Sequence, residues 1–247
     1  MNYTYTDFTE DNYRKLLLTA KENYFFATYN DSITTKKHVI WRHDIDFSPH
    51  RAYRLAQIEK DVGVKSTYCI LLHCEFYNAL ERTCTEIFKK IIDLGHDIGL
   101  HFDPSFYNLK YGENNTLDNF LHFERGILEN VLHTQIHMFS FHNPEVGDWL
   151  NFTDETAGGL INAYSSKFRQ KYGYCSDSNG YWRFRRLGDV LTAHKEGKLH
   201  VLTHPEWWVP EEMSPRDRIS RCIDGRSSFQ HSFYDDLLES LSRKNIR

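Results

Sequence analysis

Several features that would place this chain of 247 residues in a familiar class are missing from it. No apolar run approaches the length of a membrane span, and residues 1–7 lack the basic and apolar regions of a secretory signal. There is no Gly-x-Gly-x-x-Gly motif, no internal repeat and no low-complexity segment. The net charge of −4 lacks the basic excess of nucleic-acid-binding proteins. We therefore expect no membrane span and no nucleic acid as the main partner.

The cysteines also lack a pattern. The chain has five cysteines, an odd number. None of them lies in a Cys-x-x-Cys pair, and this argues against a thiolate zinc site and a thioredoxin-like motif. We interpret them as reduced thiols and predict a cytoplasmic location. Histidine, in contrast, is abundant. The 14 histidines suggest a metal site or an acid–base site.

Apolar runs alternate with amphipathic stretches along the chain. Strands are predicted at 39–46, 64–72, 97–102, 136–141, 173–177 and 199–203, and helices at 9–23, 49–62, 83–94 and 117–131. Strands that alternate with helices indicate an α/β protein with a largely parallel sheet, and six strands without a dinucleotide motif favour an α/β barrel. We expect one domain, with an N-terminal helical cap (1–35), a barrel core (36–210) and a C-terminal helical segment (211–247).

The most informative segment is the predicted strand at 39–46, which contains Asp44 and Asp46. Side chains two residues apart on a strand project from the same face. Two adjacent like charges are unfavourable unless a metal ion or a shared proton compensates them. The pair is therefore a candidate for a base and a metal ligand.

Four other predicted strands also run into histidine or aspartate. The side chains are His101 with Asp103, His142, Asp177 and His204. Active sites of α/β barrels lie at the carboxyl ends of the strands. Five strand ends of this kind together predict a polar site at that end of the barrel.

Each of these residues also has a structural interpretation. His43 falls on the face opposite the two aspartates, which favours a structural role. Asp103 precedes a proline and either caps a loop or binds the metal. His142 and Asp177 form either a hydrogen-bonded structural pair or part of the site.

Three further residues are candidates for binding the substrate. Trp207 and Trp208 follow the last predicted strand end and either pack in the core or offer a stacking platform to a sugar ring. Arg183 is either a surface charge or a group that holds an anionic substrate.

In their order, these motifs resemble the polysaccharide deacetylases, the NodB-homology or carbohydrate esterase family 4 group, over about residues 39–208. Asp44 and Asp46 look like the catalytic base and metal ligand of its first motif. Residues 95–101 are similar to its second motif, which implies that His101 is a metal ligand. Asp177 resembles the aspartate of the fourth motif, and His204 the general acid of the last.

Two departures from that family pattern concern the metal. The second metal histidine of the family lies four residues after the first, where this chain has Ser105. The Arg-x-Pro of the third motif is replaced by residues 142–144, His-Asn-Pro. We expect His142 to be the third ligand, with Asp103 as the alternative, which gives an Asp/His/His set with open positions for water.

The resemblance implies a distorted, incomplete (β/α) barrel of about seven strands that binds a divalent metal, with zinc as first choice. The implied reaction removes an N-acyl group, acetyl or formyl, from an amino sugar or sugar precursor of surface-polysaccharide biosynthesis, with the sugar linked to a nucleotide or lipid. Asp44 would act as base and His204 as acid, while Asp177 would orient Arg183 or His142. The alternatives are a catalytically inactive, carbohydrate-binding deacetylase-like protein and a metal hydrolase of a non-sugar amide.

Overall fold

The structure is a computed structural model that describes residues 4–31 and 36–246. Its strands are β1 (Phe25–Ala27), β2 (His38–Ile45), β3 (Thr67–Leu71), β4 (Asp97–Phe102), β5 (Met138–Phe141), β6 (Thr156–Ala157), β7 (Leu160–Asn162), β8 (Gly173–Ser176) and β9 (Lys198–Thr203). Its α-helices are α1 (Glu10–Asn23), α2 (Pro49–Val62), α3 (Arg82–Asp93), α4 (Asn114–Leu132), α5 (Ser166–Lys171), α6 (Leu187–Ala193) and α7 (Pro215–Ser240).

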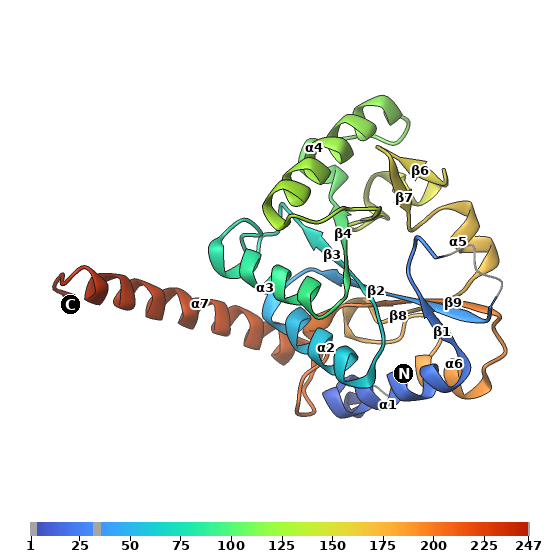
Figure 1. Ribbon diagram of the computed structural model, residues 1–247, viewed down its shortest axis with the longest axis horizontal. Coiled ribbons are helices and arrows are strands. Elements are labelled where there is room, and N and C mark those ends of the chain that lie inside the picture. The colour runs from blue at the N-terminus through green and yellow to red at the C-terminus, as the bar shows by residue number, and fades with distance from the viewer. Residues whose placement is uncertain (1–3, 32–35, 247) are drawn as a thin grey trace.

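The strands form one curled sheet in the order β6-β7-β5-β4-β3-β2-β9-β8, with β1 paired to the start of β2 (Figure 1). Every pairing is parallel except that of β6 with β7. Among the described residues the edge strands β6 and β8 do not pair with each other, so the barrel stays open. The predicted α/β class and incomplete (β/α) barrel are confirmed.

Helices α6, α1, α2, α3 and α4 cover the outside of the curl, each in contact with the next. Contacts run from α6 to α1, from α1 to α2, from α2 to α3 and from α3 to α4. Helix α2 begins where the Ser48 hydroxyl accepts from the Arg51 N–H, and it ends at Gly63, which has a φ of 76°. A side-chain cap at the start and a left-handed glycine at the end are the signals that the sequence offers for this helix.

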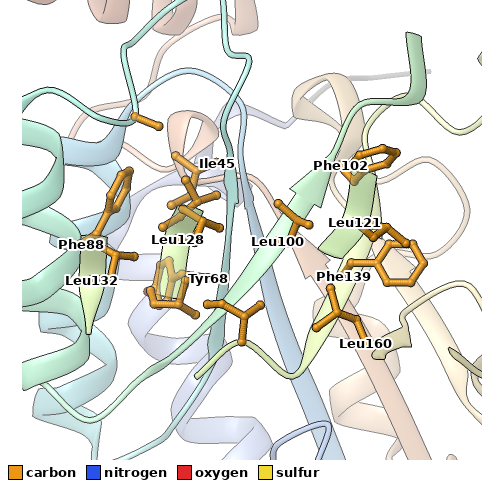
Figure 2. Close-up of a cluster of buried hydrophobic side chains, with 14 of the residues drawn as sticks. Ile45, Tyr68, Phe88, Leu100, Phe102, Leu121, Leu128, Leu132, Phe139 and Leu160 are labelled. Atoms are coloured by element: carbon orange, nitrogen blue, oxygen red, sulfur yellow. The ribbon is translucent and has the colours of Figure 1, made fainter. Parts of the chain in front are cut away.

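The largest apolar cluster lies between the sheet and helices α3 and α4 (Figure 2). Ile45, Tyr68 and Leu100 come from three neighbouring strands, and Phe88 and Leu128 come from the two helices. All five side chains are at most 1% exposed. Because β2 turns Ile45 outward to this cluster, its alternate residues face the inside of the curl.

Three of the shortest strands were absent from the prediction. Residues 24–26 were expected in the N-terminal cap, but β1 extends the sheet beside β2. Strands β6 and β7 form a small antiparallel pair next to β5. Strand β3 begins at Thr67 instead of residue 64. Two- and three-residue strands carry too little periodicity to be recognised in a sequence.

Helix α7 begins against the barrel, where Arg218 is buried and Arg226 pairs with Glu81, and its C-terminal part extends away as a rod (Figure 1). The predicted C-terminal helical segment therefore exists over most of its length. The predicted boundaries at residues 1, 35 and 247 lie outside the described residues. No helix in the described part of the chain has the length and apolar character needed to cross a membrane.

Candidate active site

Five strand ends meet around one cavity of about 1030 Å³. Asp46 follows β2, His101 lies near the end of β4, and His142 follows β5; all three line the cavity. His204 follows β9 and lines it as well, while Asp177 follows β8 directly behind His204. The strands are parallel and in register, so their carboxyl ends deliver these side chains to one place.

Three of these residues form a compact set of metal-ligand atoms. The Asp46 Oδ1 atom lies 3.2 Å from His101 Nε2 and 3.6 Å from His142 Nδ1, and the two nitrogens are 3.1 Å apart. Ligand atoms about 2.0–2.2 Å from a tetrahedral zinc ion are separated by about 3.3 Å. The three residues therefore fit a zinc ion and leave a fourth position for water or substrate.

The hydrogen bonds behind His101 determine which of its nitrogens faces Asp46. Ser140 Oγ donates to Asp44 Oδ1 at 3.1 Å, so its oxygen accepts from His101 Nδ1 at 2.8 Å. The Nε2 atom then carries a lone pair toward Asp46 Oδ1, a buried atom without a hydrogen-bond partner. Two lone pairs facing each other at 3.2 Å repel unless a cation lies between them.

Asp46 is suited to bind a cation because it stays ionised. Burial by itself raises the pKa of a carboxyl group. Here the neighbouring imidazoles of His101 and His142 outweigh burial and hold the pKa of Asp46 well below its ordinary value. The same contact with Asp46 outweighs burial at His142 and raises the pKa of that imidazole.

Asp44 is buried beneath the metal-ligand set and is held by an arginine from its own strand. Arg42 Nε lies 3.1 Å from Asp44 Oδ1, and Arg42 Nη2 donates to Oδ2 at 3.2 Å. Burial favours the protonated carboxyl, but the guanidinium outweighs it and lowers the pKa of Asp44. Asp44 therefore lines the cavity as an oriented carboxylate.

His204 and Asp177 form a buried pair. Asp177 Oδ1 accepts from His204 Nδ1 at 2.7 Å and from its backbone N–H at 3.0 Å, and Asp177 Oδ2 accepts from Trp208 Nε1 at 2.9 Å. Although burial lowers the pKa of an imidazole, the bond and charge of Asp177 raise the pKa of His204 to about 10. The His204 Nε2 atom points toward Asp46, 3.9 Å from its Oδ2.

This pair corrects the expectation about the partner of Asp177. His142 and Arg183 were named as the groups it would orient, but its side chain is bonded to His204 and Trp208. The three strands β2, β9 and β8 are adjacent, so the residues that follow β8 and β9 meet directly. His142 follows β5 and meets the residues from β2 and β4 instead.

The remaining predicted residues differ in whether they line the cavity and in what they contact there. Trp207 lines the cavity, whereas Trp208 is fully buried behind Asp177 and outside the lining. Arg183 lies on the cavity wall, where its Nη1 donates to Glu145 Oε1 at 3.1 Å. Asp103 lines the cavity too, but its carboxyl accepts from the Ser105 N–H at 2.8 Å as a loop cap.

Three buried polar residues of the site were not among the candidates. Arg42 has a signal in the sequence, because it lies on the same strand face as Asp44. Ser140 lies in an apolar strand, where a lone hydroxyl marks no function. Glu206 follows His204 by two residues in the His-Pro-Glu segment and lines the cavity.

No family model matches the sequence, and no curated protein matches it. Among solved structures, the chain is similar to a family 4 carbohydrate esterase from Bacillus anthracis, at 17% identity and a TM-score of 0.44 over 97% of this chain and 100% of the other. It is also similar to a family 4 acetyl xylan esterase from Clostridium thermocellum in complex with a cobalt ion, at 14% identity and a TM-score of 0.46 over 76% and 84% of the two chains.

A third similar structure is a mutant of a Bacillus anthracis pseudoenzyme of the same family, described as having restored enzymatic activity. The identity is 14% and the TM-score 0.44, over 79% of this chain. The match spans 64% of the length of that structure. These descriptions name the family that the sequence motifs resemble.

Proposed function

We propose that the protein is a metal-dependent hydrolase that removes an N-acyl group from an amino sugar or a sugar precursor. The observation that carries this proposal is the set of donor atoms from Asp46, His101 and His142, whose separations of 3.1–3.6 Å suit one tetrahedral cation. Asp44 and His204 line the same cavity as this set. A base, an acid and an open metal position are the groups that metal-assisted amide hydrolysis requires.

A divalent cation, with zinc as first choice, would lower the pKa of a water molecule and polarise the acyl oxygen. Asp44 takes the proton of the attacking water, and Arg42 keeps it ionised and oriented. His204, held protonated by Asp177, gives its Nε2 proton to the leaving amine. Trp208 acts through Asp177, whose second oxygen it holds.

The cavity fits a sugar-sized substrate. Its volume of about 1030 Å³ is at the upper end of the range for small-molecule sites, and its wall combines carboxylates with aromatic rings. Trp207 and Arg183 are proposed to contact the substrate. The choice between acetyl and formyl, the role in surface-polysaccharide biosynthesis and a nucleotide or lipid carrier stay predictions. A cytoplasmic location also stays a prediction, and the free thiols of all five cysteines support it.

Elemental analysis of protein purified without added metal tests the proposal. We expect one equivalent of zinc or another transition metal in the wild type. The Asp46→Ala variant should lose it while keeping the circular dichroism of the folded protein. Asp103→Ala is the matched control, because Asp103 caps its own loop and should leave the metal content unchanged.

The second measurement is amine release from N-acetyl and N-formyl amino sugars. Metal-dependent release by the wild type supports the proposal. A wild-type protein that neither contains nor takes up a metal would favour the alternative of an inactive carbohydrate-binding protein. Release from simple amides without release from amino sugars would favour a hydrolase of non-sugar amides.

A further inference from the structure

One buried carboxyl group in the described part of the chain has neither a hydrogen bond to another residue nor an ion-pair partner; Glu124 also lacks a hydrogen bond, but His73 Nε2 lies 3.1 Å from its Oε1. Seven acidic side chains are buried there, and six of them have an arginine or histidine partner: Asp7, Glu10, Asp44, Glu59, Glu124 and Asp177. Glu206 is the seventh. It is 0% exposed, and neither of its carboxyl oxygens has a hydrogen-bond partner on another described residue.

An unpaired buried carboxyl group is costly, since it loses the solvation of water without a replacement. Glu59 shows how the same chain satisfies such a group. Its two oxygens accept from the hydroxyls of Tyr13, Ser66 and Tyr68 and pair with His43. The contrast indicates that the partner of Glu206 comes from outside the chain.

The position of Glu206 restricts what that partner is. The side chain belongs to the short 3₁₀ helix Pro205–Trp207, directly after His204, and lines the cavity. The next residue, Trp207, lines the cavity too, and its indole N–H is a second buried polar group without a partner. Consecutive residues thus offer an unused carboxyl group and an unused N–H donor.

We propose that Glu206 and Trp207 form a hydroxyl-binding subsite for the sugar ring that carries the scissile N-acyl group. This inference rests on the proposed function and adds the two residues that hold the ring of its substrate. A sugar ring carries several hydroxyls, and each can donate to a carboxyl oxygen or accept from an indole N–H, so one ring offers partners for both kinds of orphaned atom. Phe47 supplies an aromatic ring 6.3 Å from that of Trp207, a surface suited to the apolar face of a sugar.

Other ligand chemistry fits less well. A metal ion fits less well, because Glu206 is not among the described residues whose donor atoms lie close enough together to share one ion. An anionic group such as a phosphate would face both Glu206 and Asp46. The ring at this subsite therefore carries hydroxyl groups instead of negative charge.

The experiment measures binding of N-acetylglucosamine to the metal-free full chain by ligand-observed NMR and calorimetry. The proteins are the wild type, Glu206→Gln, Glu206→Ala and the control Glu212→Ala, which removes an exposed carboxyl group six residues further on. We expect about tenfold weaker binding for Glu206→Ala, a smaller loss for Glu206→Gln and none for Glu212→Ala. The melting temperature of Glu206→Gln should equal or exceed that of the wild type, whereas a structural role predicts a decrease.

Deoxy analogues of N-acetylglucosamine identify the hydroxyl. The analogue lacking it should bind the wild type about tenfold more weakly, with no further loss for Glu206→Ala. Equal affinity of wild type and Glu206→Ala, no binding by the wild type, or a lower melting temperature of Glu206→Gln would overturn the inference. Glu206-dependent binding without amine release after zinc is added would overturn the proposed hydrolase and leave the subsite standing. Amine release whose KM is the same in Glu206→Ala as in the wild type would overturn the subsite and leave the proposed hydrolase standing.

Discussion

His204 Nδ1 donates to Asp177 Oδ1 at 2.7 Å, and the same oxygen accepts from the backbone N–H of His204 at 3.0 Å. One carboxylate thus fixes both the side chain and the backbone of the proposed acid. Trp208 holds the other oxygen of Asp177, so the carboxylate has little freedom to turn. The arrangement keeps the imidazole protonated and aims its Nε2 into the cavity.

Asp177→Asn should lower the pKa of His204. Without the negative charge of Asp177, burial weighs more heavily, and the pKa of His204 falls from about 10, with only the charges of Asp46 and Glu206 still raising it. NMR titration of the metal-free protein measures this shift. We expect amine release to fall about 100-fold or more, because the general acid is lost. Asp154→Asn, on an exposed loop, should leave both quantities unchanged.

The same pair predicts how stability depends on pH. The pKa of His204 is raised in the folded protein, so the pair contributes fully to the free energy of unfolding below the ordinary histidine pKa near 6.5. It is lost as the pH rises toward about 10. The difference in unfolding free energy between wild type and Asp177→Asn should therefore be larger at pH 6 than at pH 10. A difference that grows with pH would contradict a protonated His204.

The third metal ligand can be identified by two matched substitutions. His142→Ala removes a donor atom 3.6 Å from Asp46 Oδ1, and we expect zinc affinity to fall at least about 100-fold. Ser105→Ala alters the position where the family pattern has a histidine, and it should leave zinc affinity unchanged. Competition with a chelator of known affinity measures both. A larger loss of zinc affinity in Ser105→Ala than in His142→Ala would place the metal nearer to Ser105.

Arg42 supplies the positive charge that offsets the desolvation of the buried Asp44 carboxylate. Arg42→Leu leaves the carboxylate without a counter-charge, and we expect a loss of about 3–5 kcal/mol in unfolding free energy. Urea denaturation near neutral pH measures it. The companion variant Arg42→Leu/Asp44→Leu removes both charges and should recover part of the loss. If Arg42→Leu alone costs nothing, the ion pair is not what keeps Asp44 ionised.

The sequence was sufficient for the fold class and for the positions of Asp46, His101 and His204, because alternation along strands and the strand ends are local properties. It could not reveal which strand ends touch. Asp177 follows β8 and meets His204 after β9 because those strands are neighbours in the sheet. Glu206 escaped notice for a related reason, since its missing partner is visible only once every neighbouring side chain is placed.

On the other face of β2, Glu59 should stabilise the protein in a pH-dependent way. His43 pairs with it at 2.7 Å, and the His43 Nδ1 atom contacts Thr203 Oγ1 at 2.8 Å, one residue before His204. Burial raises the pKa of a carboxyl group, but the charge and bonds of His43 and other donors lower that of Glu59 to about 2. Its contribution is therefore complete above the ordinary value near 4.5 and is lost as the pH falls toward 2.

Glu59→Gln should lower the unfolding free energy by about 3 kcal/mol at pH 7, and the difference from wild type should shrink as the pH falls from 4.5 to 2. Urea denaturation across this pH range measures it. Glu22→Gln, on the exposed side of α1, is the control and should show no difference at any pH. Because Thr203 precedes His204, Glu59→Gln should also reduce amine release more than Glu22→Gln does. A stability difference that is constant from pH 7 to 2 would mean that the charge of Glu59 is not what the tyrosines and His43 stabilise.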